Sequence, residues 1–210
     1  MKKIILAFMF VCPALLKAQP SGDAFRSFIP AGWELLAAAS GDLNKDSIDD
    51  VAIIIEERVG SGDFGKLRNI MILFRAKDGK YSLACKGEKA VMGSESGGTM
   101  GDGFNEMKIV KGVIILNFAG GSRDQWDLTY RYRYQNGDFY MIGATNKGGN
   151  GIDSYNFDFN VNTGKMIVVK KYKSNPKKNI NETRVVKKDP QPMLKSFEPW
   201  TLQYDGGVTF

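Results

Sequence analysis

The feature that most constrains this chain is a strict alternation of apolar and polar side chains along short segments. Residues 126–134 place Trp, Leu and Tyr at every second position, with Asp, Thr and Arg between them. A period of two puts the apolar side chains on one face of a β-strand, so this segment is predicted to be a half-buried strand. Asn136-Gly137 follows, a pair typical of the two-residue turn in a β-hairpin. The returning strand is expected at 139–145.

The same pattern recurs along most of the chain. Short apolar or alternating segments are separated by Gly, Asn and Asp turns, and no segment shows a convincing helical period. The predicted strands are 33–39, 51–57, 69–75, 80–86, 107–110, 113–118, 126–134, 139–145, 154–160 and 165–172. We therefore expect an all-β protein, an antiparallel meander of about ten strands. It would form a curved sheet, a sandwich or a partly closed barrel, or propeller-like blades, although a full propeller needs more strands.

The N-terminus has the features of a secretory signal peptide. Lys2 and Lys3 precede an apolar stretch, and the small residue Ala18 marks the expected cleavage point. The apolar stretch is too short for a transmembrane helix. We therefore expect a signal peptide at 1–18, export to the periplasm or the cell exterior, and no membrane span after cleavage. Residues 19–210 are expected to form a single all-β domain.

Charge is unevenly distributed along the chain. The net charge of +6 falls to +3 without the three lysines of the signal peptide, and residues 165–195 carry ten Lys and Arg against two Asp and Glu. Such a basic segment fits an anionic component of the cell envelope, and it equally fits a solvated surface. Nucleic acid is not an expected partner of an exported protein. A tail at 196–210 is expected to dock on the domain through its apolar residues.

The chain contains no histidine. This excludes Ser-His-Asp and Cys-His catalysis and every histidine-ligated zinc or iron site. After signal cleavage one cysteine remains, Cys85, so an internal disulfide cannot form. Catalytic chemistry would have to rest on carboxylates, Lys, Tyr or a bound calcium ion, and no catalytic residue is assigned.

Oxygen-bearing side chains recur in the loop that precedes the second predicted strand. Asp42, Asn44, Asp46 and Asp50 carry them, and Ile48 stands where a loop would turn its backbone carbonyl inward. Calcium takes about six to eight oxygen ligands at flexible angles, and a tight loop with this pattern supplies them. The sequence therefore predicts one calcium ion at these five residues. The alternative is a polar turn that binds nothing.

This loop differs from an EF-hand. Its twelfth position, counted from Asp42, is Ile53 and not Glu, and the β-branched residues that follow indicate a strand. The sixth position is Ser47, where Gly would adopt a positive φ without steric cost. A strained or weaker calcium site is therefore expected.

Two further segments are candidate sites. Glu95 and Asp102 lie in a glycine-rich segment and would form the carboxylate pair of a glycosidase-like hydrolase, if this segment is not simply a surface loop. Arg123 and Trp126 would form a patch for a sugar, because aromatic rings stack on sugar rings. The alternative for Trp126 is a core position, because it begins an alternating strand.

Three motifs together resemble a known group of proteins. They are the Asp-Leu-Asn-x-Asp loop at 42–46, Gly-Gly-x-Met-Gly-Asp-x-Phe at 97–104 and Gly-Gly-Ser-Arg-x-x-Trp at 120–126. They are similar to exported bacterial proteins of unknown function with VCBS/FG-GAP-type calcium loops, as in integrin α propellers. The resemblance implies a calcium-stabilised β fold and no assigned reaction. We expect an exported calcium-binding module that binds a polysaccharide or an envelope component, with the hydrolase as the alternative.

Overall fold

The structure, a computed structural model, describes residues 26–187 and 190–210, and the predicted signal peptide at 1–18 lies outside them. Within these ranges the regular structure consists of β-strands and short 3₁₀ turns, without an α-helix. All paired strands are antiparallel, and neighbours in each sheet follow one another along the chain. The predicted all-β meander is therefore confirmed. No helix in the described ranges has the length and apolar character needed to cross a membrane.

The first sheet contains four strands in chain order. They are β1 (Trp33–Gly41), β2 (Asp50–Glu57), β3 (Arg68–Arg75) and β4 (Tyr81–Gly87). β2 and β3 bury side chains on both faces of the sheet, which explains their almost uninterrupted apolar sequences. One face joins the main core, and the other packs against a second cluster that includes Phe28, Ile29 and Trp33.

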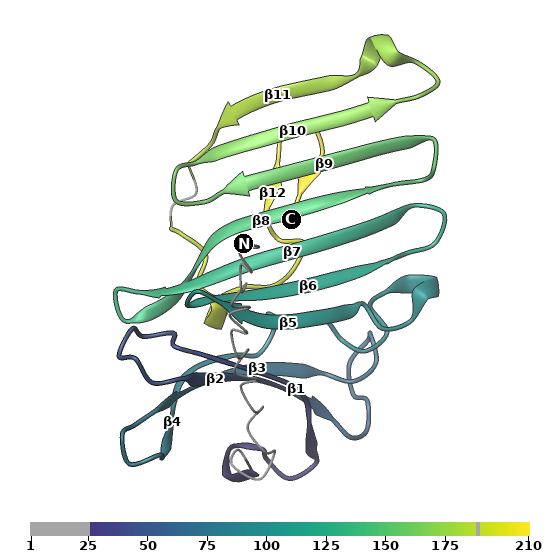
Figure 1. The fold of residues 1–210 in the computed structure, drawn as a ribbon. Coiled ribbons are helices and arrows are strands. Elements are labelled where there is room, and N and C mark those ends of the chain that lie inside the picture. Colours follow the sequence, from purple (N-terminus) through teal and green to yellow (C-terminus); the bar gives the residue numbers. More distant parts are fainter. Residues whose placement is uncertain (1–25, 188–189) are drawn as a thin grey trace, which may run out of the picture.

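The second sheet contains seven strands, again in chain order from β5 to β11. They are β5 (Phe104–Val110), β6 (Val113–Gly121), β7 (Gln125–Gln135), β8 (Asp138–Gly149), β9 (Asp153–Asn160), β10 (Lys165–Tyr172) and β11 (Ile180–Val185). Figure 1 shows β5 next to the four-stranded sheet and the other strands stacked away from it. Neither sheet closes into a barrel, so the molecule consists of open sheets around a shared core.

The alternation in β7 places one face of the seven-stranded sheet in the core. Leu128, Tyr130 and Tyr132 are fully buried, whereas the intervening Thr129 and Arg131 are only partly buried. The turn that follows has the backbone its sequence predicts, with positive φ at both of its central residues, 136 and 137. This hairpin therefore follows directly from the local sequence.

The C-terminal segment, residues 190–210, covers part of the inner face of the seven-stranded sheet. Its first residues contact β8, where the Met141 N–H donates to the Pro192 carbonyl (2.8 Å). The segment also contains the 3₁₀ turn η4 (Leu194–Ser196) and the short strands β12 (Gln203–Tyr204) and β13 (Val208–Thr209). Its buried side chains include Leu194, Phe197, Leu202, Val208 and Phe210. In Figure 1 this segment, in yellow, lies behind the sheet.

β11 was not expected, because the sequence after 172 reads as a polar, basic connection. The strand pairs with β10 in a register that runs from Lys165 opposite Val185 to Lys170 opposite Ile180. Most of its side chains are exposed, so it lacks the alternation that would reveal a strand. An edge strand needs only one hydrogen-bonded neighbour and no buried face, which is why polar residues suffice there.

Candidate functional site

The predicted calcium loop joins β1 to β2. Its backbone adopts left-handed conformations at Lys45 and Ser47, each with φ of 68°. These turns bring the loop's own N–H groups to the Asp42 carboxylate, which accepts hydrogen bonds from the N–H of Lys45 (2.7 Å) and of Ser47 (3.0 Å). The position where the sequence lacks the usual Gly is therefore one where the backbone has a positive φ.

Asn44 and Asp46 continue this arrangement. The Asp46 N–H donates to Asn44 Oδ1 (3.0 Å), and the Ile48 N–H donates to Asp46 Oδ1 (2.8 Å). Asn44 Nδ2 in turn donates to Asp46 Oδ2 (3.0 Å). Each of these side-chain oxygens is already engaged in one hydrogen bond and retains further acceptor capacity.

Asp50 differs from Asp42, Asn44 and Asp46 because it is fully buried. Its Oδ2 accepts hydrogen bonds from the N–H of Leu43 (3.0 Å) and of Asn44 (3.3 Å), and its Oδ1 accepts one from the N–H of Arg75 (3.0 Å). Burial raises the pKa of Asp50, and these backbone hydrogen bonds oppose the rise without cancelling it. Asp50 thus attaches the loop to the end of β3.

The donor set fits calcium by its chemistry, since it offers three carboxylates, one amide oxygen and a backbone carbonyl. The positions of these groups match a calcium site less well than their chemistry does. Across residues 26–187 and 190–210, no group of three or more His, Cys, Asp or Glu side chains lies close enough together to hold a metal ion. Both oxygens of Asp50 face backbone N–H groups, and Asp46 contacts the Asn44 amide nitrogen. Calcium binding would require Asp46 to exchange that amide contact for the ion.

Asp102, one of the two predicted hydrolase carboxylates, is 44% exposed and is paired with the buried guanidinium group of Arg68. Arg68 donates to both of its oxygens, from Nη1 (2.7 Å) and from Nη2 (2.6 Å), and Nη2 also donates to Glu56 Oε2 (2.9 Å). Burial alone would raise the pKa of Asp102, but hydrogen bonds from Arg68 and from the Phe104 N–H, with the charge of Arg68, lower it below its usual value. A carboxyl group held ionised in this way is poorly suited to act as a general acid.

The other predicted carboxylate, Glu95, lies beside the neighbouring loop at Gly65. Its N–H donates to the carbonyl of Phe64 (3.0 Å), and a Cβ atom on Gly65 would lie 2.9 Å from its Cγ. The glycine-rich segment is thus fastened at one point to this loop and at another, through Asp102, to Arg68 of β3. Both contacts hold the glycine-rich segment in place against the rest of the fold.

Trp126 lies where three cavities meet. The first, which we call the aromatic cavity, has a volume of about 480 Å³ and is lined by residues that include Trp126, Tyr155, Tyr172 and Trp200. The turn cavity, about 520 Å³, includes Met100, Trp126 and Ile152 in its lining. The tail cavity, about 510 Å³, includes Phe64, Leu67, Trp126 and Trp200. Trp126 is therefore only partly a core residue, because its half-buried ring also borders open space.

The rings of the aromatic cavity are held by contacts with one another. Trp126 and Trp200 meet edge to face, with centroids 5.2 Å apart and an interplanar angle of 88°. The backbone N–H of Trp200 donates to the Tyr130 hydroxyl (3.2 Å). Tyr155 stacks on Phe157 with ring centroids 4.9 Å apart. Trp126, Tyr155 and Trp200 are half-buried, so fixed aromatic surface faces the cavity.

Asn146 of β8 adds an unsatisfied polar atom to the lining of the aromatic cavity. Its side chain is 3% exposed, and its Nδ2 donates to the carbonyl of Thr209 (2.8 Å). Its Oδ1 is buried and accepts no hydrogen bond from any described residue. A buried acceptor left unpaired costs about 1–3 kcal/mol, so a donor that reached this oxygen would be stabilised.

The charged groups of the aromatic cavity are predominantly acidic. Asp124 and Asp153 line it together with a single basic residue, Lys170. Lys170 Nζ donates to the Gly206 carbonyl (2.6 Å) and lies 5.4 Å from the centroid of the Phe157 ring. The one cation is therefore held against the protein, and the carboxylates dominate the charge of the lining.

Of the two residues of the predicted sugar patch, Trp126 lines these cavities and Arg123 does not. Arg123 is exposed in the connection between β6 and β7 and does not line any of the three cavities around Trp126. Trp126 was identified from the sequence as an aromatic residue that could stack on a sugar ring. Tyr155 and Trp200, which lie far from it in the sequence, carried no signal that would place them beside it.

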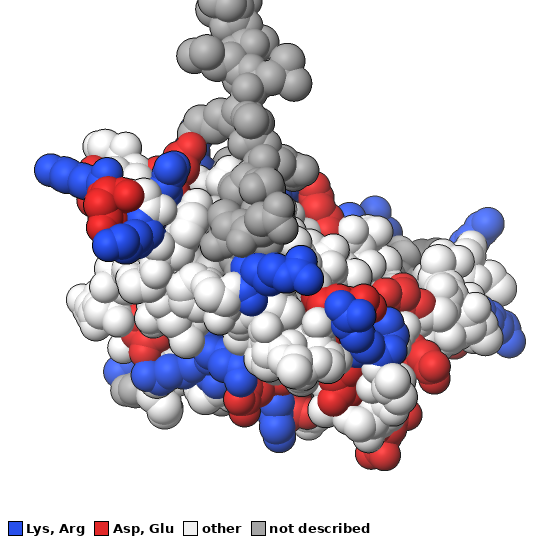
Figure 2. Space-filling view, turned by 90° about the horizontal axis from the view of Figure 1, so that it is seen from below, with Lys and Arg blue, Asp and Glu red and all other residues white. Residues whose placement is uncertain are grey.

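Several cations of the basic segment at 165–195 have acceptors within the protein. Arg184 is paired with Glu182 and donates to the Asp205 carbonyl (2.7 Å), and Lys195 is paired with Asp138. Figure 2 shows the molecule from below, at the end away from β10 and β11 in Figure 1, where Lys and Arg mix with Asp and Glu around a mainly uncharged area. That face does not carry a large patch of a single charge.

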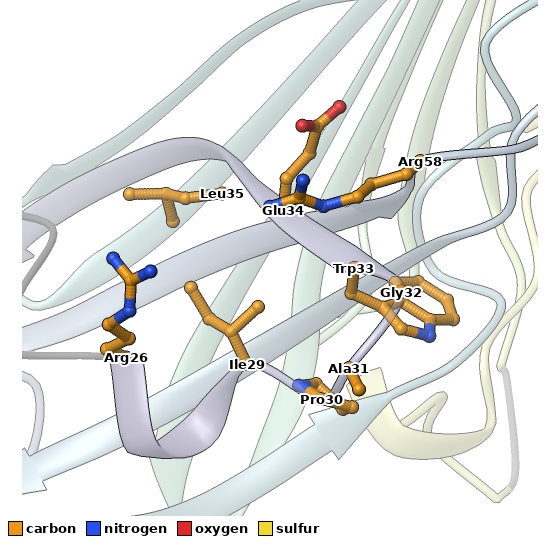
Figure 3. Close-up of a pocket in the computed structure, with 9 residues that line it drawn as sticks. All are labelled: Arg26, Ile29, Pro30, Ala31, Gly32, Trp33, Glu34, Leu35 and Arg58. Carbon is orange, nitrogen blue, oxygen red and sulfur yellow. The ribbon is translucent and has the colours of Figure 1, made fainter.

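A fourth cavity, of about 560 Å³, lies beside the start of β1 (Figure 3). Figure 3 shows Arg26, Trp33 and Arg58 around it, with Ile29 and Leu35 between them. Trp33 also packs on the second apolar cluster. Because Arg26 is the first described residue, we assign no function to this cavity.

The fold and these sites define an open, all-β protein with a polar loop at one end and linked cavities around a tryptophan at the other. Comparison with protein-family models, with curated proteins and with solved structures finds no match for this chain. The function is therefore argued from the chain's own geometry.

Proposed function

We propose that this protein is an exported, calcium-stabilised β module that binds a polysaccharide or a related component of the cell envelope at the aromatic cavity. Export rests on the predicted signal peptide at 1–18, and calcium on the donor set of the 42–50 loop. The binding surface is the set of linked cavities around Trp126.

The observation that carries this proposal is the composition of the aromatic cavity. Three half-buried rings, those of Trp126, Tyr155 and Trp200, lie with carboxylates around one open volume. Aromatic rings offer flat apolar surface for the C–H faces of a sugar, and carboxylates accept hydrogen bonds from its hydroxyl groups. Binding sites usually combine apolar walls with a few polar groups in this way.

The hydrolase alternative has less support. It requires one of Glu95 and Asp102 to donate a proton and the other to act as a base. Arg68 lowers the pKa of Asp102, which makes this carboxyl group unsuitable as the proton donor and weakens it as a base. A binding module needs neither a proton donor nor a paired carboxylate. We therefore favour binding without catalysis.

The binding proposal is tested with the purified chain, residues 19–210, and insoluble cellulose, chitin, starch and peptidoglycan. At least one of these should retain the protein, and Trp126→Ala should abolish the retention because the ring is common to all three cavities. Val59→Ala is the matched control, since Val59 is 80% exposed and lines none of these cavities. Failure of all four polymers to retain the parent protein would contradict the proposal.

The calcium proposal is tested by thermal unfolding. Three carboxylates in one loop repel each other, and an ion that binds only the folded state stabilises it by about 2.7 kcal/mol at 100 times its dissociation constant. Extracellular modules bind calcium at roughly 10⁻⁴ to 10⁻³ M, so millimolar calcium should raise the melting temperature. Asp46→Ala should remove this increase, whereas Asp78→Ala, in the exposed turn between β3 and β4, should keep it.

Calorimetry gives the decisive outcome for the metal. An absence of binding heat at several millimolar calcium would refute the calcium proposal. So would an Asp46→Ala protein that responds to calcium as the parent does. Neither result would affect the binding of a polysaccharide at the other end of the molecule.

A further inference from the structure

The three cavities around Trp126 adjoin one another through shared lining residues, and we call them together the Trp126 groove. The aromatic and turn cavities share Trp126, Gly149 and Ser154, which lie at adjacent ends of β7, β8 and β9. The aromatic and tail cavities share Trp126 and Trp200, whose rings are in contact. A ligand longer than one cavity can therefore extend from any one of them into the next across the Trp126 ring.

Apolar side chains are exposed in both outer cavities. Phe64 and Leu67 in the tail cavity are 65% and 47% exposed, and Met100 and Ile152 in the turn cavity are 58% and 53% exposed. These are among the most exposed large apolar residues of the described chain. Exposed apolar residues that gather around one groove indicate a binding surface more than an accident of packing.

Charge along the groove argues against an acidic ligand. In the turn cavity Asp127 and Asp153 face a single lysine, Lys147, which lies 3.7 Å from Asp127. In the tail cavity Lys89 is paired with Glu198 (3.4 Å). Acidic groups therefore equal or exceed basic ones along the groove, and a polyanion would be repelled from the aromatic and turn cavities.

Asn146, a lining residue of the aromatic cavity, has a side-chain oxygen without a partner. This Oδ1 is buried and receives no donor from the described part of the chain, while the Nδ2 of the same side chain is fixed by Thr209. A buried polar atom of this kind calls for a donor from outside the chain. Sugar hydroxyl groups supply such donors without adding charge.

We propose that this groove binds an uncharged oligosaccharide chain of at least three sugar units, one in each cavity, with the Trp126 ring shared between them. This inference rests on the proposed function and defines its ligand class. The central unit stacks against the aromatic rings and directs a hydroxyl group toward Asn146. The outer units lie against Phe64 on one side and Met100 on the other.

Tryptophan fluorescence can measure this binding directly. The chain has three tryptophans, and Trp33→Phe removes the one that lies outside the groove. The probes are oligomers of one to six units of β-1,4-linked glucose, α-1,4-linked glucose and β-1,4-linked N-acetylglucosamine. In at least one series the dissociation constant should fall by about tenfold or more between one and three units, because each added unit fills another cavity. Longer chains should then give little further gain.

Two substitutions locate the outer units. Phe64→Ala and Met100→Ala should each lose most of the gain from chain length and keep the affinity for a single sugar. Both side chains are more than half exposed, so the fold should be unaffected. Val59→Ala, with a more exposed side chain outside the groove, should behave like the parent.

Each contrary outcome has a distinct meaning. Equal affinity for one and three units, or unchanged chain-length dependence in both variants, would overturn the three-unit proposal while the proposed function stands. Tighter binding of galacturonic acid oligomers than of every uncharged series would overturn the uncharged ligand class. If no oligomer binds although an insoluble polysaccharide retains the protein, only this inference fails. If neither binds, the proposed function fails as well.

Discussion

At the scale of single residues, Ser47 is the most informative position in the calcium loop. Its φ of 68° lies in the left-handed region, which costs a residue with a Cβ atom about 1–2 kcal/mol relative to the right-handed region. The loop accepts this cost because the Ser47 N–H then reaches the Asp42 carboxylate. A strained residue inside a polar loop fits a site where geometry matters more than stability.

Ser47→Gly should therefore stabilise the protein by about 1 kcal/mol and tighten calcium binding. The reason is that Gly adopts the observed conformation without strain, and the loop would be better pre-organised for the ion. Denaturant unfolding and calorimetry measure the two effects. Asn136→Gly is the control, since Asn136 also has a positive φ (52°) but lies in the turn between β7 and β8. It should leave calcium affinity unchanged. A Ser47→Gly protein with weaker calcium binding would refute this account of the loop.

At the scale of elements, Arg68 joins β2, β3 and the glycine-rich segment through one buried guanidinium group. Only 1% of its side chain is exposed, and it contacts both Glu56 and Asp102. Burial would raise the pKa of Glu56, but hydrogen bonds from Lys66 and Arg68, with their charges, lower it. The pKa of Asp102 is lowered in the same way. Because both pKa values are lower in the folded state, the stabilisation is present above about pH 4 and is lost as the pH falls further.

Asp102→Asn should destabilise the protein at neutral pH by about 1 kcal/mol, because the buried Arg68 would lose a charged partner, while the 44% exposure of the Asp102 side chain keeps the effect small. The difference from the parent should shrink as the pH falls below about 4, where the parent loses the same interaction. Denaturant unfolding between pH 3 and pH 7 measures this difference. Asp78→Asn, which breaks only the exposed pair with Lys80, should have little effect. A constant difference across that pH range would show that the ion pair does not carry the effect.

The strands could be predicted from the sequence where burial imposes alternation, as in β7, or a continuous apolar run, as in β2. β11 could not, because its exposed side chains carry no periodic signal. The same distinction between local sequence signals and distant packing applies to the candidate site. The oxygen-bearing side chains of the 42–50 loop are local and can be read from the sequence, whereas the approach of Trp200 to Trp126 depends on how a distant segment packs. The partner of Asp102 was missed for the same reason, since Arg68 is 34 residues away in the chain.

At the scale of the whole molecule, the 42–50 loop and the cavities around Trp126 lie near opposite ends of β7. The backbone N–H of Arg75 donates to Asp50 of the loop. The preceding residue is Phe74, whose ring packs against Tyr134 near the C-terminal end of β7. Trp126 lies near the N-terminal end of the same strand. At the usual rise of a β-strand the two points are roughly 27 Å apart. Sites so far apart, without a shared partner, usually act independently.

Calcium should therefore raise the melting temperature without changing the affinity for a sugar chain by more than about twofold. Fluorescence titration with and without millimolar calcium, at a temperature where both forms are folded, makes this comparison. Asp46→Ala should bind the sugar chain as the parent does. A large change of sugar affinity with calcium would show that binding at the loop and binding at the cavities around Trp126 are coupled through the sheet.

The packing of the C-terminal segment affects when the fold can form during synthesis. Ribosomes make β5 to β10 before residues 194–210, whose buried Leu202 and Phe210 cover the inner face of that sheet. Until this late segment emerges, aromatic side chains such as Tyr130 and Phe159 lack part of their cover, and the nascent chain exposes a surface that chaperones recognise. The core of the seven-stranded sheet therefore cannot be fully buried until residues 194–210 have been made. For a protein that is proposed to cross a membrane before it folds, this postponement keeps the chain in a state that can still be threaded.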